Sequence, residues 1–332
     1  MRPTPRLLAA MLLAVAGCGG PFPQTTLAPR SDLGVQVDSL FTTIFWWAVA
    51  VFVIVEGLLL FVVIRYRQRE GGGKPSTLHG HTILEIGWTL APALILVFIA
   101  VPTMRTIFAT AARAPAGALR VEVVGHQWWW EFRYPDLGVV TANEMHLARG
   151  RPVQLEMTSA DVIHSFWAPG LGGKRDLTPG RVTRIAFTPD SIGEVAGQCA
   201  EFCGASHANM RLRVFVESDS AFAAWTARQL TAAAVPPRGS PAERGQDLFA
   251  HGACIACHTI DGLPQARGKI GPNLTHVGSR TTVAGAMLPN TEEWLRRWIA
   301  NAPYLKPGSL MPAMPLPDDQ VAALIAYLQS LK

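Results

Sequence analysis

Two long apolar runs dominate the first third of the chain. One extends from Leu40 to Ile64 and the other from Ile83 to Met104, and each is long enough to cross a bilayer as a helix. The segment between them, residues 65–82, has an excess of basic side chains, which is typical of a cytoplasmic loop. Both ends of this helical hairpin are therefore expected on the outer face of the membrane. The basic residues are Arg65, Arg67, Arg69 and Lys74, opposed by Glu70.

The first 17 residues have the pattern of an export signal. Arg2 and Arg6 precede an apolar run from Leu7 to Val15, as in a secretory signal peptide. The sequence V-A-G-C that follows resembles a lipoprotein processing site, which would leave Cys18 as the lipidated N-terminus of the mature protein. An ordinary signal peptide with an incidental cysteine and an uncleaved anchor are the alternatives.

From residue 119 onward, apolar and polar residues alternate in short stretches. Leu119–Val124, Arg151–Met157, Arg181–Phe187 and Met210–Val216 are clear examples, and this period of two is typical of strands with one buried face. Turns rich in Gly and Pro separate these stretches. Several short strands in succession predict a β-sandwich or Greek-key barrel.

Helical spacing returns in the last third of the chain. Ser218–Ala234 is predicted to be a short helix, and Glu243–Ala250 and Asp318–Leu331 are predicted to be the terminal helices of a further domain. Between them, residues 232–242 read A-A-A-V-P-P-R-G-S-P-A, without periodicity. We expect this linker to act as a flexible tether with an r.m.s. span of about 20 Å.

Composition agrees with a membrane protein. Hydrophobic residues make up 49% of the 332 residues and charged residues only 16%. The net charge of +5 is concentrated in the basic loop, so we expect no nucleic-acid partner.

One loop gathers soft metal donors. The motif Q-C-A-E-F-C-G-A-S-H-A-N-M contains Cys199, Cys203, His207 and Met210, and thiolate, imidazole and thioether are donors that copper prefers. Two cysteines in one loop suggest two bridged coppers, which need a second imidazole, and His164 is the best candidate. A disulfide and a structural zinc site are the alternatives. Copper ligands on loops at one end of a sandwich would make this a cupredoxin domain.

A second motif predicts a covalent haem. C-I-A-C-H supplies Cys254, Cys257 and His258, and C-x-x-C-H attaches c-type haem. A thioredoxin-like C-x-x-C is the alternative, but no βαβ pattern surrounds the motif. Met311 and Met314 in K-P-G-S-L-M-P-A-M-P could supply the sixth iron ligand. With Cys18 assigned to lipid, none of the five cysteines is left for a disulfide.

Together these motifs resemble subunit II of haem–copper cytochrome oxidases, in the caa-type form with a fused haem c domain. The resemblance covers residues 40–332 and implies a dinuclear CuA site. One copper would take a histidine and the methionine, and the other a histidine and a backbone carbonyl, with both thiolates bridging. In that order, the ligands would be His164 and Met210, His207 and Glu201, and Cys199 and Cys203.

The resemblance also implies roles for single residues. Trp128, in G-H-Q-W-W-W-E-F, would accept electrons over the copper site, and an exposed indole there would suit a docking surface; ordinary packing is the alternative. Glu85 would lie at the mouth of a proton channel, unless it only caps a helix start. Glu201 would reach a magnesium ion shared with subunit I. Asp161 matches an acidic docking position or is a solvated turn residue, and the K-P-G lead-in favours Met311 over Met314.

The predicted fold is therefore multi-domain, with a two-helix transmembrane hairpin, an all-β cupredoxin domain and an all-α cytochrome c domain. The predicted boundaries are residues 1–17 for the signal peptide, 18–39 for the lipidated segment, 40–110 for the hairpin, 111–231 for the CuA domain, 232–242 for the linker and 243–332 for the cytochrome domain.

The implied function is that of subunit II of a respiratory cytochrome c oxidase. It would pass electrons from haem c to CuA and on to subunit I, where dioxygen is reduced to water with proton pumping. Subunits I and III would be its partners, and cytochrome c or a bc-type complex its electron donor. The expected location is the bacterial inner membrane, with both redox domains on the periplasmic face. The alternatives are a CuA subunit of a nitric oxide reductase and a stand-alone copper-binding lipoprotein.

Overall fold

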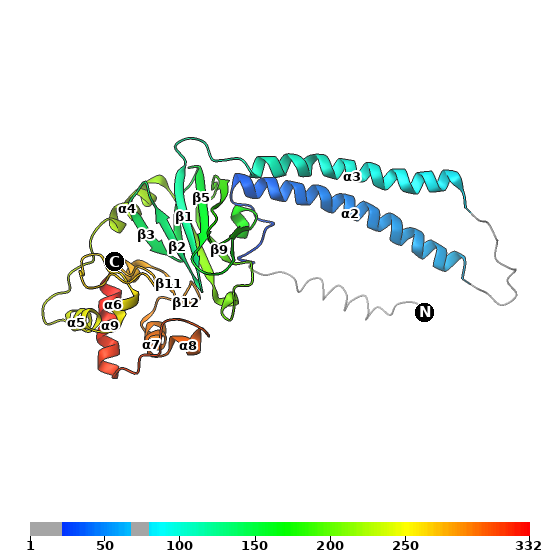
Figure 1. The fold of residues 1–332 in the computed structure, drawn as a ribbon. Coiled ribbons are helices and arrows are strands. Elements are labelled where there is room, and N and C mark those ends of the chain that lie inside the picture. Colours follow the sequence, from blue (N-terminus) through cyan, green and yellow to red (C-terminus); the bar gives the residue numbers. More distant parts are fainter. Residues whose placement is uncertain (1–21, 68–79) are drawn as a thin grey trace.

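The computed structural model describes residues 22–67 and 80–332. These residues form two long helices, a β-sandwich and a C-terminal helical domain (Figure 1). Cys18, the signal segment and most of the basic loop, including Arg69 and Lys74, lie outside the described residues, so the predictions for export and lipidation concern parts of the chain without a structural description.

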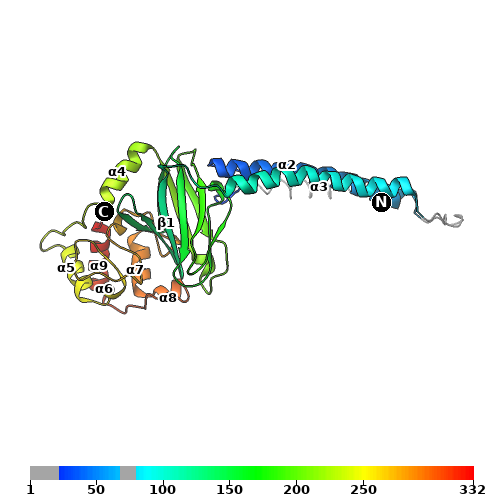
Figure 2. The ribbon, with the colours of Figure 1, turned by 45° about the horizontal axis from the view of Figure 1, so that its top comes forward.

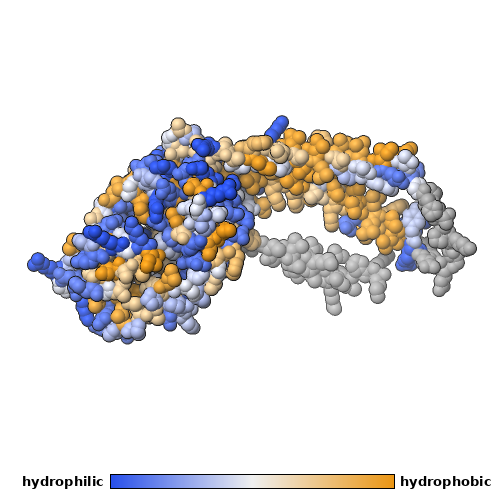
Figure 3. Space-filling model, viewed as in Figure 1, coloured by the Kyte–Doolittle hydropathy of each residue, from blue (hydrophilic) through white to orange (hydrophobic). Residues whose placement is uncertain are grey.

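Helices α2 (Asp32–Arg65) and α3 (Thr82–Thr110) lie side by side and project away from the sandwich (Figures 1 and 2). Both are long and apolar enough to cross a membrane. Figure 3 shows that their surface is largely hydrophobic, in contrast to the mixed surface of the other domains. The arrangement agrees with the predicted two-pass hairpin.

The middle domain is a sandwich of two five-stranded sheets in the described part of the chain, with strand orders β3-β2-β1-β5-β8 and β4-β10-β9-β6-β7. Its strands alternate buried and less buried positions, as β5 does with Val153, Leu155 and Met157 inside. The first sheet consists of β1 (Leu119–His126), β2 (Trp129–Tyr134), β3 (Val139–Ala142), β5 (Val153–Ser159) and β8 (Thr183–Phe187). The second consists of β4 (Glu144–Ala148), β6 (His164–Trp167), β7 (Arg175–Leu177), β9 (Gly193–Cys199) and β10 (Arg211–Glu217).

Helix α4 (Asp219–Gln229) follows the last strand of the sandwich. The Ser218 hydroxyl caps its start by accepting a hydrogen bond from Ala221 N at 3.2 Å. Phe222 and Trp225 are buried and join the core of the sandwich. The helix is shorter than the predicted Ser218–Ala234, since it ends at the C-cap residue Leu230 and the backbone is irregular from residue 232.

The C-terminal domain surrounds its own hydrophobic core. Helices α5 and α9 cross, and Gly245 allows their close approach, because a Cβ there would lie only 2.0 Å from the carbonyl oxygen of Ala323. The helices are α5 (Pro241–His251), α6 (Cys254–Cys257), α7 (Glu292–Ala300), α8 (Ala302–Leu305) and α9 (Asp318–Ser330), with a two-stranded ribbon of β11 (Thr282–Val283) and β12 (Leu288–Pro289).

The C-terminal domain docks directly on the sandwich instead of being held only by a flexible tether. Ser206 donates a hydrogen bond to Pro307 O at 2.6 Å, and Arg211 N donates to Gly285 O at 3.0 Å. In the predicted linker, Ala233 N donates to Asp261 O of the C-terminal domain at 2.9 Å, and Pro236 is buried. The composition of residues 232–242 predicted the irregular backbone of residues 232–240, but it missed the start of α5 at Pro241 and carries no information about these docking contacts.

Candidate metal centre and haem site

Neighbouring strands bring the soft donors together. Strands β9 and β10 pair antiparallel, so the loop that connects them starts at Cys199 and ends at Met210, beside its own origin. Cys199 N donates a hydrogen bond to Met210 O at 2.9 Å, which closes the loop. His164 is the first residue of β6, and β6 pairs with β9 on the side opposite β10. This pairing places the distant histidine next to the cysteines.

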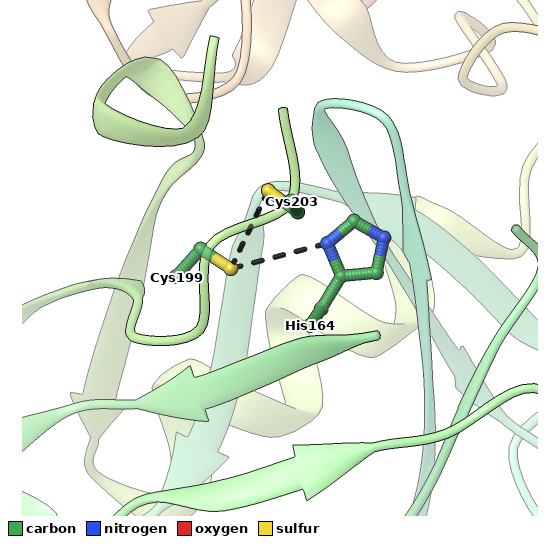
Figure 4. A group of neighbouring side chains, drawn as sticks. All are labelled: His164, Cys199 and Cys203. Atoms are coloured by element: carbon green, nitrogen blue, oxygen red, sulfur yellow. Dashed lines mark hydrogen bonds between the residues drawn. The ribbon is translucent and has the colours of Figure 1, made fainter. Parts of the chain in front are cut away.

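Three donors form a buried cluster in which the ligand atoms lie within 4.8 Å of one another (Figure 4). The Sγ atoms of Cys199 and Cys203 are 3.8 Å apart, and His164 Nδ1 is 3.9 Å from Cys199 Sγ. A disulfide requires about 2.05 Å between sulfurs, and both cysteines are free. The structure therefore contradicts the disulfide alternative.

The remaining predicted donors border the same cluster. His207 Nδ1 is 3.5 Å and Met210 Sδ 3.9 Å from Cys203 Sγ. The backbone carbonyl of Glu201 is 3.3 Å from Cys199 Sγ. The structure thus brings together all six positions singled out in the sequence, and their donor set of thiolate, imidazole, thioether and carbonyl fits copper.

The two thiols differ in acidity. The hydrogen bond between the two thiols lowers the pKa of Cys199 and raises the pKa of Cys203. Cys199 therefore loses its proton more easily than Cys203. Because a metal binds thiolates, loading this site would release protons.

Asp161 orients His164, a role that sequence reasoning missed. Its Oδ1 lies 2.7 Å from His164 Nε2, and its Oδ2 accepts a hydrogen bond from Gln127 N at 2.6 Å. Burial disfavours the charged imidazole, but the hydrogen bonds to Asp161 and Cys199 outweigh it and raise the pKa of His164. With Nε2 held by the carboxylate, Nδ1 faces the sulfurs, as expected of a metal ligand fixed by an outer partner. The three-residue spacing from Asp161 to His164 was the available signal.

Trp128 is buried, with only 9% exposed. Its indole Nε1 donates to Cys203 O at 3.0 Å, and Gln127 Nε2 donates to the same oxygen at 2.7 Å. The C-terminal domain covers the ring, since a Cβ on Gly308 would lie 2.6 Å from it. The prediction of an exposed indole at this position is therefore wrong, because the fused domain occupies the surface.

A cavity of about 200 Å³ lies beside the C-x-x-C-H motif. Cys254, Cys257 and His258 line it, as do both methionines of the K-P-G segment. The His258 Nδ1–H group donates to Pro272 O at 2.8 Å, which leaves Nε2 free as a ligand. Burial lowers the pKa of His258 and keeps the imidazole neutral, so the residues fit an axially ligated haem.

Met311 and Met314 are both half-buried at this cavity. Met311 N bonds to Ser309 Oγ at 3.3 Å, and Met314 N bonds to Ala300 O at 3.1 Å. The choice of Met311 as the iron ligand stays a prediction.

Glu85 and the acidic side chain of Glu201 lie apart from these sites. Glu85 occupies the first turn of α3, at the end far from the sandwich (Figure 1), where its Oε1 accepts a hydrogen bond from His81 N at 3.2 Å. This is the helix-start arrangement, and it leaves the proton-path role a prediction. The Glu201 side chain is exposed. Within residues 22–67 and 80–332, one cluster contains three or more His, Cys, Asp or Glu side chains close enough to bind a metal ion, and it consists of His164, Cys199 and Cys203. Nothing in the described chain therefore supports a magnesium site.

Comparisons with known proteins agree with both sites. The model of the transmembrane domain of cytochrome c oxidase subunit II matches residues 28–106, that of its periplasmic domain matches residues 139–218, and that of cytochrome c matches residues 242–332. These families imply copper, rather than zinc, in the sandwich and haem in the C-terminal domain. Cytochrome c oxidase subunit 2 of Alkalihalophilus pseudofirmus is 34% identical, with 98% of this chain and 96% of that protein covered. The protein of the same name from Bacillus subtilis is 32% identical at the same coverage. The chain therefore belongs to the cytochrome c oxidase subunit II family, in the form that carries a fused C-terminal cytochrome c domain.

Proposed function

We propose that this subunit relays electrons from its own haem c to a dinuclear CuA centre and on to subunit I, where dioxygen is reduced to water with proton pumping. One observation carries the proposal: Trp128 contacts both sites. It lines the cavity beside His258 and donates its indole hydrogen bond to Cys203 O at 3.0 Å. A single side chain therefore bridges the two regions that would bind the redox groups.

The chain's own residues hold and orient those groups. Copper and haem, when bound, supply the electron-carrying chemistry. Asp161 holds the His164 ring, and Pro272 O holds the His258 ring, so that each imidazole presents one fixed nitrogen. His164, Met210, His207, the Glu201 carbonyl, Cys199 and Cys203 would hold copper, and Cys254, Cys257, His258 and Met311 would hold the haem.

The proposal extends to topology and partners. The basic loop after Arg65 faces the cytoplasm and both redox domains face the periplasm of a bacterial inner membrane. Subunits I and III are the partners, and cytochrome c or a bc-type complex is the donor. Glu85, at the cytoplasmic end of α3, is the proton-path residue. Glu201 would share a magnesium ion only with ligands from subunit I. Cys18 is the lipidated N-terminus.

Purification of the complex from its native membrane tests this function. We expect subunit I to copurify, with a haem a absorption band, a c-type haem and two coppers assigned to this chain. A complex without haem a that reduces nitric oxide would favour the nitric oxide reductase alternative. Isolation of the chain alone, with copper but no partner subunit, would instead indicate a copper-binding lipoprotein.

A further inference from the structure

A buried carboxylate of the sandwich is bound entirely by the C-terminal domain. Glu144 opens strand β4 and is only 2% exposed. Its Oε1 accepts hydrogen bonds from Thr281 Oγ1 at 2.8 Å, Thr282 N at 2.7 Å and Thr282 Oγ1 at 2.6 Å, and its Oε2 accepts one from Thr281 N at 3.2 Å. Hydrogen bonds to an ionised carboxylate are about twice as strong as neutral ones. Glu144 therefore forms a strong contact between domains.

A buried lysine side chain forms the reciprocal contact. Lys306 belongs to the C-terminal domain and is 4% exposed. Its Nζ donates to Trp128 O in the sandwich at 2.6 Å and to Ala284 O in its own domain at 2.8 Å. Each domain thus inserts one buried polar side chain into the interface: Glu144 accepts from backbone and hydroxyl groups of the C-terminal domain, and Lys306 donates to a backbone oxygen of the sandwich. Directional contacts of this kind fix an orientation, which a flexible tether does not.

The two contacts flank the residue that connects the sites. Glu144 follows Asn143, which lines the haem cavity with Trp128. Lys306 holds the backbone oxygen of Trp128 itself, while the indole of that residue reaches the copper loop. An opening of the interface would separate Trp128 from the haem cavity and would also break the contact of the copper loop through Ser206.

We propose that Glu144 and Lys306 are positioning residues that lock the cytochrome domain onto the copper domain and so fix the distance between the two redox sites. The lock also buries Trp128, so a soluble donor must deliver electrons to the haem domain and not to the copper loop. This inference rests on the proposed relay for its functional meaning, but the lock itself is a structural claim.

The test cuts the linker and asks whether the domain stays in place. A site for a specific protease, introduced within residues 234–240 of the complete oxidase complex, is cleaved, and the complex is passed through a gel-filtration column at about micromolar concentration. We expect the c haem to remain with the complex in the otherwise wild-type protein. In Glu144→Gln, an amide NH₂ group replaces one acceptor oxygen and faces the threonine donors. The affinity of the cleaved haem domain for the rest of the complex should therefore fall about 10- to 100-fold.

Matched variants separate the lock from general damage. Thr282→Val removes the hydroxyl donor and should weaken retention, whereas Thr282→Ser keeps the hydroxyl and should restore it. Glu156→Gln, in an ion pair with Arg184 on the other sheet, should leave retention unchanged.

Release of the wild-type domain after cleavage would overturn the lock, whatever the electron-transfer rate, as would full retention in Glu144→Gln. A third outcome separates the two proposals. If the cleaved domain is retained in the wild type and released in Glu144→Gln, the lock stands. If electrons nevertheless do not pass from haem c to copper in the intact complex, the proposed relay fails. If the relay operates, Glu144→Gln should slow it and make it sensitive to viscosity before any cleavage, with unchanged haem and copper spectra.

Discussion

At the scale of single residues, the copper assignment depends on two thiols. Cys199 and Cys203 lie 3.8 Å apart, with His164 and the Glu201 carbonyl beside the first and His207 and Met210 beside the second. We expect Cys199→Ser and Cys203→Ser each to abolish the mixed-valence electron paramagnetic resonance signal, because each removes one of the two soft thiolate donors on which the proposed copper pair depends. Metal analysis should show the loss of paired copper. A wild-type protein that binds one copper or one zinc per chain after reconstitution with copper would contradict the dinuclear site.

The second prediction at this scale concerns the haem. We expect Met311→Ala to abolish the weak near-infrared sulfur-to-iron band and to lower the reduction potential, because a thioether ligand raises it. Met314→Ala, at the other methionine of the same cavity, is the matched control and should keep the band. The reverse result would show that Met314 is the ligand.

The donor residues could be predicted from sequence because their spacing within one loop is itself the signal. Cys199 to Met210 are joined by a short connection, so tertiary structure adds only His164. For Asp161, the three-residue spacing to His164 was the one signal in the sequence. Glu144 could not be assigned in this way, because its partners are brought close by the fold, and nothing in the residues next to it indicates that Thr281 and Thr282 will meet it.

At the scale of elements, the crossing of α5 and α9 sets the stability of the cytochrome domain. A Cβ at Gly245 would lie 2.0 Å from Ala323 O and 2.8 Å from the Cβ of Tyr327. We expect Gly245→Ala to destabilise this domain by about 2 kcal/mol or more, since overpacking a tight contact forces the helices apart. The stability of the cytochrome domain is measured in the full chain from the temperature at which the sulfur-to-iron band is lost.

Asp247→Ala, two residues further along the same helix at an exposed position, is the control for this change. Its effect should stay within about 0.5 kcal/mol. A Gly245→Ala variant that is as stable as this control would show that the helices can separate without cost.

The elements themselves were largely predictable, and their ends were not. Hydropathy placed the first membrane helix at Leu40–Ile64, but α2 begins at Asp32. The extension mixes polar and apolar residues and is fixed by contacts that hydropathy does not register. Ser31 Oγ accepts a hydrogen bond from Gly34 N at 2.9 Å, and Asp32 Oδ1 accepts one from Thr188 N of the sandwich at 2.7 Å. These contacts anchor the start of the helix to the β-domain.

At the scale of the whole molecule, the fused domain changes the meaning of the linker. Residues 232–242 have the composition of a tether, and a tether alone would give an effective concentration on the order of millimolar. The structure adds a docked interface through Glu144, Lys306 and Ser206. Linker cleavage should therefore leave electron transfer intact, whereas a flexible tether alone would make the transfer slower and concentration-dependent after cleavage.

The central claim is that electrons pass from haem c to copper within one chain. The most direct test injects one electron photochemically into haem c of the oxidised complex, without soluble cytochrome c, and follows the haem band and the near-infrared copper band together. The account predicts that haem oxidation and copper reduction occur with equal amplitude and one first-order rate, independent of protein concentration and nearly independent of salt. A Cys254→Ser/Cys257→Ser variant, which cannot attach haem, should show no such phase. If haem c stays reduced until soluble cytochrome c is added, or if the rate rises with protein concentration, the intramolecular route is contradicted.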